Sequence, residues 1–230
     1  MTQLLISVKN YEEAMSALDA GADIIDLKDS EKGALGALPL HTIERIVRAV
    51  NGQVPTSATV GDWHEDLTGL IAKIRATSNT GVDYIKAEYG KSLHTRKWTN
   101  AIAEIKTYGV KLIVMFLVDK YANFSEIESF KALGFSGVML DTEGKMEHHL
   151  LDYLQPTELS QIAMRLKKVG LISGFSGSLR IEHVEILSDI APDFLGFRGG
   201  VCHQFNRQNT LSPSKIEDIR NMLYKNNIYM

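Results

Sequence analysis

The sequence predicts an α/β fold, a single-domain (β/α)8 TIM barrel spanning residues 1–230, and three observations lead to it. Apolar segments of four to six residues alternate with longer segments of helical period, which is the pattern of a parallel sheet built from strand–helix units. Eight such units can be counted, and eight units in roughly 250 residues is the usual size of a (β/α)8 barrel. No Pro-, Gly- or Ser-rich linker and no run of charge divides the chain, so we expect one domain.

The expected elements follow in order along the chain. Strands are predicted at residues 4–8, 24–28, 54–59, 84–87, 111–117, 137–141, 171–176 and 194–197, each followed by a helix. Glycine adopts the left-handed conformation of a helix end without strain, and glycines stand at five expected helix ends: Gly21, Gly81, Gly109, Gly134 and Gly170. The closing helix should begin at Pro213, with Ser212 as its N-cap.

An open, doubly wound sheet is the alternative fold. Such a sheet normally carries a glycine-rich dinucleotide-binding turn after its first strand, and the corresponding segment here, "SVKNYEEAM", has no glycine. The barrel is therefore preferred.

Composition and charge indicate which partners the protein is expected to lack and in which compartment it is expected to lie. A net charge of −3, a pI near 6.2 and scattered basic residues argue against a nucleic-acid partner. The N-terminal segment "MTQLLISVKNYEEA" is too briefly apolar for a signal peptide, and no membrane partner is expected. A single cysteine, Cys202, excludes an internal disulfide, so we expect a reducing, cytoplasmic location. The seven histidines lack a metal-binding spacing, and the adjacent His148 and His149 are interpreted as part of a polar loop, not as a metal site.

Charged residues gather where the predicted strands end, which is where barrel enzymes hold their reacting groups. Side chains alternate faces along a strand, so Ile25 and Leu27 should face the helices. Asp26 and Lys28 then share the barrel side. The same rule turns inward the strand-end residues Lys86, Glu88 and Asp141. Two lysines and two or three carboxylates should therefore converge in the barrel mouth.

The two lysines suggest covalent chemistry. An ammonium group deep in a barrel mouth is costly unless it is paired, and its pKa falls near a second cation or in an apolar pocket. A lysine of lowered pKa is nucleophilic toward carbonyls, as Schiff-base catalysis requires. From the residues alone, either Lys28 or Lys86 could be that nucleophile, and a structural ion-pair network is the alternative for both. Lys145, four residues beyond Asp141, could fold over the pocket or lie solvated in its loop.

The loops after the seventh and eighth strands are candidates for binding phosphate. Small residues crowd both turns, in "GFSGSLRIEHV" and "GFRGGVCH", so backbone N–H groups could approach an anion, and a helix dipole after Ser178 would favour it. Barrels commonly bind phosphate in these two loops, although glycines can also serve turn geometry alone. The predicted substrate- or phosphate-binding residues are Thr59, Ser176, Gly177, Ser178, Arg198, Gly199 and Gly200.

Six segments carry a resemblance to a known family: "GADIIDLKDSEKGALGA", "SATVGD", "DYIKAEYG", "VMLDTEGK", "SGSLRIEHV" and "GFRGGVCH". Together they resemble the (5-formylfuran-3-yl)methyl phosphate synthase family, also called 4-(hydroxymethyl)-2-furancarboxaldehyde-phosphate synthase, from Leu4 to about Arg207. The resemblance implies a (β/α)8 lyase that condenses two glyceraldehyde 3-phosphate molecules into the furan phosphate, on the way to methanofuran-type one-carbon cofactors. It implies no metal and no organic cofactor.

The resemblance also assigns residues by position. The family's Schiff-base lysine falls on Lys28, with Asp26 beside it. Its other active-site lysines fall on Lys86 and Lys145, and its second aspartate falls on Asp141. Two segments, "KLIVMFLVDKYANF" and "CHQFNRQNT", depart from the family pattern and bear on the shape of the pocket wall.

Rival functions remain at this point. The chain could be another class I aldolase, a triose isomerase with Glu88 as base, or a barrel that only binds a phosphorylated metabolite. Phe124, Phe130 and Phe205 are expected to be exposed, where they could serve a homo-oligomer contact or local packing.

Overall fold

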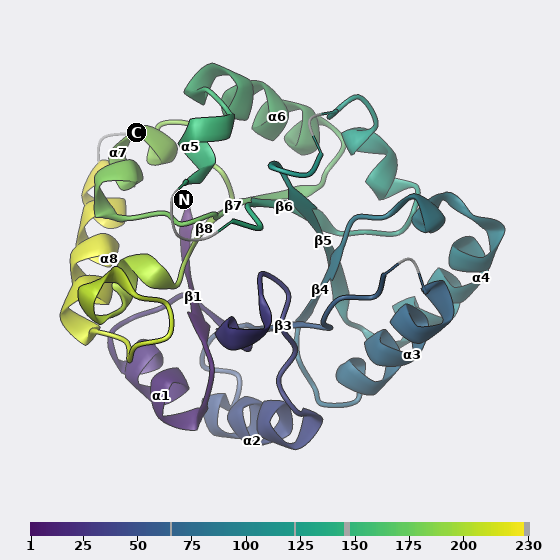
Figure 1. The fold of residues 1–230 in the computed structure, drawn as a ribbon, viewed down its shortest axis with the longest axis horizontal. Helices are drawn as coiled ribbons and strands as arrows, with labels where there is room; N and C mark the ends of the chain where they lie inside the picture. Colours follow the sequence, from purple (N-terminus) through teal and green to yellow (C-terminus); the bar gives the residue numbers. More distant parts are fainter. Residues whose placement is uncertain (65, 122, 145–147, 228–230) are drawn as a thin grey trace.

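Eight parallel strands close into a barrel, each pairing with its neighbours in chain order and β8 pairing back with β1 (Figure 1). The computed structural model describes residues 1–64, 66–121, 123–144 and 148–227. The strands are β1 Gln3–Val8, β2 Ile24–Leu27, β3 Thr56–Thr59, β4 Tyr84–Glu88, β5 Lys111–Leu117, β6 Gly137–Asp141, β7 Ile172–Phe175 and β8 Phe194–Phe197. The predicted fold class is confirmed.

Helices surround the barrel. The α-helices are α1 Tyr11–Asp19, α2 Leu40–Val50, α3 Leu67–Ser78, α4 Arg96–Ile105, α5 Leu150–Tyr153, α6 Pro156–Lys168, α7 Val184–Ser188 and α8 Pro213–Asn227. Short 3₁₀ helices are η1 Ser30–Lys32, η2 Lys91–His94, η3 Lys106–Tyr108, η4 Ile127–Lys131, η5 Ile181–His183, η6 Gly199–Val201 and η7 His203–Phe205. The five glycines predicted to end helices all have positive φ, and α8 begins at Pro213 as expected.

One expected helix takes a different form. After β5 the described chain folds into the 3₁₀ helix η4, where a regular helix was expected. Its buried residues, Ile127 and Phe130, are three positions apart. A 3₁₀ helix has three residues per turn, so this spacing places both side chains on one face, toward the barrel.

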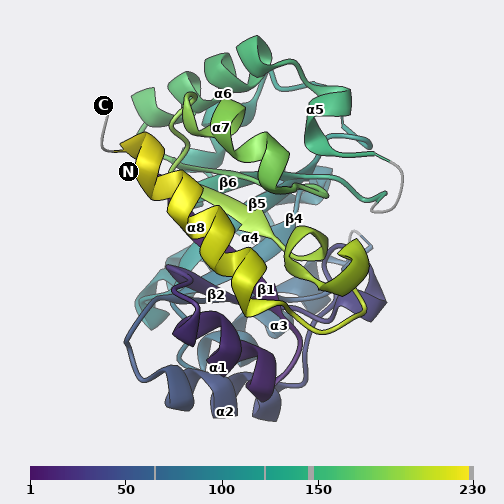
Figure 2. The same cartoon turned by 90° about the vertical axis from the view of Figure 1, so that its left-hand side faces the viewer.

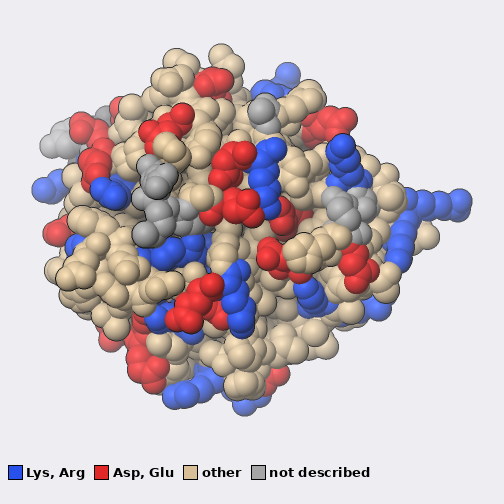
Figure 3. All heavy atoms as spheres, viewed as in Figure 1, with Lys and Arg blue, Asp and Glu red and all other residues tan. Residues whose placement is uncertain are grey.

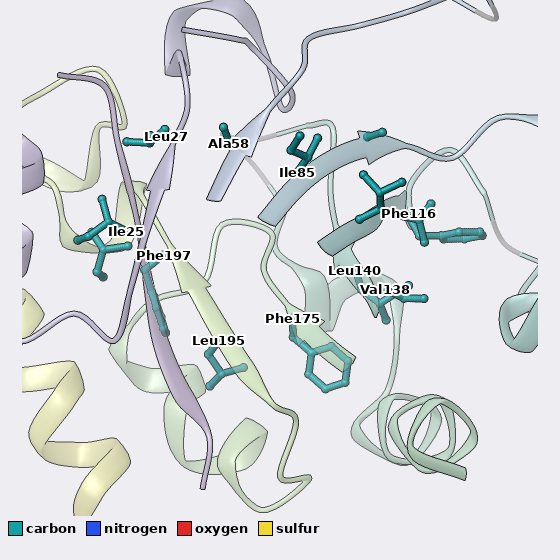
Figure 4. Close-up of a cluster of buried hydrophobic side chains, with 14 of the residues drawn as sticks. Ile25, Leu27, Ala58, Ile85, Phe116, Val138, Leu140, Phe175, Leu195 and Phe197 are labelled. Carbon is teal, nitrogen blue, oxygen red and sulfur yellow. The ribbon is translucent and has the colours of Figure 1, made fainter. Parts of the chain in front are cut away.

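Apolar side chains on the outer face of the strands form the layer between barrel and helices. Figure 4 shows this layer, which includes Ile25 and Leu27 of β2, Ile85 of β4, and Val138 and Leu140 of β6. The predicted alternation is therefore confirmed for β2, β4 and β6. A smaller apolar cluster fills the barrel interior and includes Leu5, Ile24, Ile113, Met115, Met139 and Phe194.

The two ends of the barrel differ. The loops that follow the strands gather at one end, at the right in Figure 2, while the N-terminus lies at the other. The long helix α8 runs along the outside between them (Figure 2). Among the described residues, no helix combines the length and the apolar composition that a membrane crossing requires.

The expected exposure of three phenylalanines is only partly correct. Phe130 is buried, because it packs edge-on against Tyr89 and Phe135, so the expectation was wrong for this residue. Phe124 is half-buried against Phe116. Phe205 is exposed, and its ring lies against the cations of Arg180 and Lys215.

Candidate active site

A pocket of about 520 Å³ opens in the barrel mouth. Four of the predicted catalytic residues line it: Asp26, Lys28, Lys86 and Asp141. Its walls come from the loops after β7 and β8. Figure 3 views this end of the molecule, where acidic and basic side chains are intermingled around the centre. The strand register therefore brings together residues that lie more than a hundred positions apart in the chain.

Asp26 is the fully buried centre of a polar cluster at the pocket floor. Its Oδ2 accepts a hydrogen bond of 2.7 Å from Ser7, and its Oδ1 accepts one from Ser57 and lies 2.6 Å from Lys86 Nζ. Burial alone would raise the pKa of Asp26, but the charges of Lys86 and Lys28 and the hydrogen bonds from Lys86 and Ser57 hold it below its ordinary value. Asp26 is thus held as a carboxylate.

Lys28 follows the last residue of β2 and stays within the barrel. Its backbone N–H donates to Val8 O at 3.0 Å, which continues the strand pairing by one residue. Its Nζ lies 3.8 Å from Asp141 Oδ2, and the two side chains are only 7% and 4% exposed. Asp141 is oriented in turn by the backbone N–H of Thr142, which donates to its Oδ1 at 2.8 Å. The Lys28 amine is therefore enclosed in the pocket, away from bulk solvent.

Lys86 is one of the largest fully buried side chains of the protein. Its Nζ pairs with Asp26 and also contacts Met139 Sδ, at 3.9 Å, so the amine itself lies inside the barrel. The predicted Lys145 lies outside the described residues.

The loops after β7 and β8 form a wall of the pocket above the charged residues of its floor. Ser176, Gly177, Ser178, Gly199 and Gly200 all line it, as the prediction of a binding role requires. The Ser176 hydroxyl donates to Leu140 O at 3.1 Å. The helix dipole expected directly after Ser178 is absent from the described chain there, because the next turn is the 3₁₀ helix η5 and α7 starts at Val184.

Two other predicted binding residues make structural contacts. Thr59 is fully buried and its hydroxyl donates to Gly36 O at 2.7 Å, which ties down the loop after β2. Arg198 lines the pocket, but its guanidinium pairs with the buried Glu13. A fixed ion pair leaves Arg198 poorly placed to bind an anion.

Sequence reasoning missed several residues of the site. Ser7 and Ser57 were missed, although they lie opposite Asp26 in the register of β1 and β3, and inward alternation could have found them. Arg207 and His183 also line the pocket. They lie in the segments after β8 and β7, where no repeating hydrophobic pattern indicates which way a side chain points.

The rings of His149 and His183 lie 4.3 Å apart, and burial together with the charge of His149 lowers the pKa of His183. Among the described residues, no group of His, Cys, Asp or Glu is placed to hold a metal ion.

Glu88 belongs to a different pocket, of about 230 Å³, between the loops after β3 and β5. Its carboxylate lies 3.2 Å from Lys120 Nζ. Burial raises the pKa of Glu88, although the paired Lys120 opposes the shift. The geometry therefore separates Glu88 from the two buried lysines and removes support for an isomerase that uses it as base.

Known proteins resemble the chain at two levels. Among solved structures, phosphoribosyl anthranilate isomerase from Thermus thermophilus superposes with a TM-score of 0.68 at 15% identity, covering 97% of this chain and 99% of that one. A 3-hexulose-6-phosphate synthase from Salmonella typhimurium gives a TM-score of 0.64 at 13% identity, covering 98% and 100%. Identities this low show the barrel fold alone.

Sequence relatives are more specific. A Methylorubrum extorquens protein, provisionally named (5-formylfuran-3-yl)methyl phosphate synthase, is 38% identical over 93% of this chain and 88% of its own. The Methanosarcina mazei protein named (5-formylfuran-3-yl)methyl phosphate synthase is 32% identical over 87% and 90%. The family model described as 4-HFC-P synthase matches residues 4–220. On this evidence the chain belongs to the 4-HFC-P synthase family, as the resemblance of its motifs predicted.

Proposed function

We propose that this enzyme condenses two molecules of glyceraldehyde 3-phosphate into (5-formylfuran-3-yl)methyl phosphate, with Lys28 as the Schiff-base nucleophile. The names of the relatives supply the product. The observation that carries the mechanism is the enclosure of Lys28 beside Asp141, next to the Lys86–Asp26 pair, on the floor of one pocket. In atom balance, two triose phosphates give one furan phosphate, one inorganic phosphate and two waters.

The reaction begins at the Lys28 amine. Its Nζ attacks the aldehyde carbon of one triose phosphate, and loss of water gives an iminium ion that withdraws electrons from the neighbouring carbon. A proton leaves that carbon to give an enamine, which adds to the aldehyde of the second triose phosphate. Elimination of phosphate, ring closure and dehydration then form the furan, and hydrolysis of the imine frees Lys28.

Proton transfer falls to the charged groups around Lys28. Asp141, at 3.8 Å from Nζ, is placed to exchange protons with the amine and the carbinolamine. Lys86, held by Asp26 at 2.6 Å, is a second proton donor at the pocket floor. A well-placed acid or base contributes roughly 10²–10⁴-fold to a rate. In this scheme Lys145 is a further active-site lysine, as the resemblance to the family implies.

Borohydride trapping tests the covalent step. Incubation with glyceraldehyde 3-phosphate and borohydride should add the mass of one reduced triose phosphate, and peptide mapping should place it on Lys28. The Lys28→Arg variant should gain no mass, because a guanidinium does not form the imine. Lys120→Arg, in the smaller pocket, is the matched control and should be labelled like the wild type. Label that maps to Lys86 would reassign the nucleophile.

Product formation tests the overall reaction. The protein and the triose phosphate alone should generate a new ultraviolet band and release one inorganic phosphate for each furan. Trapping on Lys28 without this band would instead support another class I aldolase. A protein that shows neither would support a binding barrel. We further propose that the enzyme acts on triose phosphate in the cytoplasm, on a route to methanofuran-type one-carbon cofactors.

A further inference from the structure

Arg198 is the arginine that the strand pattern places at the pocket, but its donors are engaged. Both guanidinium NH2 groups contact the carboxylate of Glu13, at 2.5 Å and 3.2 Å. The remaining donations go to the carbonyls of Ser7, Arg207 and Asn209, at 3.2, 2.9 and 3.2 Å. The Arg198 and Glu13 side chains are 8% and 6% exposed. Arg198 therefore neutralises Glu13 and fastens the loop after β8.

That fastened loop carries a second arginine into the pocket. Arg207 lines the pocket and is half-buried. One of its terminal nitrogens donates to Gly33 O at 2.9 Å. Its Nε is buried and makes no hydrogen bond within the described residues. A buried donor without a partner is rare in native structures unless a ligand or ordered water completes it.

The backbone of Arg207 is fixed on both sides. Its carbonyl accepts hydrogen bonds from Arg198 Nε and from the Ser30 hydroxyl, at 2.9 Å and 3.2 Å. The loop is closed by the isolated bridge between Cys202 and Leu211. The guanidinium is thus presented from a braced loop, which lowers the ordering cost of binding a ligand.

The electrostatic surroundings also favour an anion. Burial and the charge of Arg198 lower the pKa of Arg207 from its ordinary value, the charge of Asp141 opposes the shift, and the guanidinium keeps its charge. The same pocket is lined by Ser176, Gly177, Gly199 and Gly200, whose small side chains leave the backbone accessible. A guanidinium matches the oxygens of a phosphate with two parallel donors, and Nε is one member of that fork.

We propose that Arg207 binds the phosphate group of the substrate and that Arg198, paired with Glu13, is the positioning residue that holds the Arg207 loop. The proposal rests on the proposed function for the identity of the substrate. It replaces Arg198 with Arg207 as the phosphate ligand. Lys28 on the pocket floor then reacts with the carbonyl of a triose whose phosphate is held at the β8 wall.

Binding of inorganic phosphate tests the site without any chemistry. Calorimetric titration should show that Arg207→Met weakens phosphate binding roughly 10–100-fold, which is the loss of one or two hydrogen bonds to a charged group. Arg207→Lys should recover part of it, since charge remains but the fork is lost. Arg48→Met, on the exposed outer face of α2, is the control and should bind like the wild type.

A second arm separates phosphate recognition from the imine step. Borohydride labelling of Arg207→Met should need a 10–100-fold higher concentration of glyceraldehyde 3-phosphate than the wild type, and an unchanged concentration of unphosphorylated glyceraldehyde. A folding defect would impair labelling by both aldehydes. Unchanged phosphate affinity in Arg207→Met, or its loss in Arg180→Met instead, would overturn the proposal. If the wild type fails to trap either aldehyde, the Schiff-base function fails while the phosphate titration still decides the role of Arg207.

Discussion

At the scale of single residues, the site depends on a charge pair with almost no access to water. Lys86 and Asp26 are 2% and 0% exposed, and their charged atoms lie 2.6 Å apart. Removing one partner of such a pair leaves an uncompensated buried charge, whereas removing both avoids that penalty. The stability of the fold therefore depends on two residues that also take part in the proposed reaction.

This pair gives a prediction for stability. Lys86→Met should lower the free energy of unfolding by about 3–5 kcal/mol near neutral pH, since Asp26 loses its counter-charge. The double variant Lys86→Met/Asp26→Asn should recover part of that loss. Denaturant unfolding of the wild type, both single variants and the double variant measures the coupling. Strictly additive effects would show that the two groups do not stabilise each other.

The strand alternation correctly placed Asp26, Lys28, Lys86 and Asp141 in one pocket, because the face of a strand residue depends only on its parity along the chain. It could not predict their partners. Arg198 and Glu13 are 185 residues apart, and Glu13 lies in the first turn of α1, so their contact depends on closure of the barrel. Arg207 was not predicted for a related reason. The loop after β8 has no repeating hydrophobic pattern from which the direction of the Arg207 side chain could be inferred.

At the scale of elements, the wall of the pocket requires two loops to touch. A Cβ added to Gly200 would lie 2.2 Å from Leu179 O in the loop after β7, whereas one added to the neighbouring Gly199 would meet nothing closer than 3.4 Å. The backbones after β7 and β8 therefore pack directly at Gly200. Both loops contribute residues to the pocket, so their spacing sets its width.

Gly200→Ala should push these loops apart. We expect a loss of about 1–3 kcal/mol in the free energy of unfolding, the usual cost of overpacking, together with weaker binding of inorganic phosphate. Gly199→Ala is the matched control for stability, because neither the added methyl group nor a positive φ imposes strain there. Thermal unfolding of the two variants should separate them, and equal stabilities would mean that the contact is not close in solution.

At the scale of the whole molecule, the barrel was predictable because eight local repeats admit few closed arrangements of a parallel sheet. The sequence was a weaker guide to the loops. It placed Glu88 among the converging charges, but Lys120, on the loop after β5, draws its side chain into the smaller pocket. Similarly, the helix expected directly after Ser178, whose dipole was to favour phosphate binding, is absent because a 3₁₀ turn comes first in that segment.

The pH dependence of stability reports on the histidines at the pocket rim. His183 Nδ1 accepts a hydrogen bond from the Arg180 N–H at 3.1 Å, which a protonated ring could not do. Burial and the charge of His149 hold the pKa of His183 below 6.5, and Arg180 acts in the same direction, while Glu182 and Asp152 oppose the shift. The unfolded chain therefore binds this proton more readily than the folded one. The stability contributed by neutral His183 is fully present above pH 6.5 and is lost as the pH falls toward the lower folded pKa.

Replacing His183 should flatten this part of the stability curve. In the wild type, His183 adds a slope of at most about 1.4 kcal/mol per pH unit below its unfolded pKa, the limit for one proton. His183→Asn keeps an oxygen that can accept from the Arg180 N–H but cannot titrate. Its free energy of unfolding should therefore fall less steeply than that of the wild type as the pH falls below about 6.5. Parallel curves for the two proteins in this range would show that His183 keeps its ordinary pKa in the folded state.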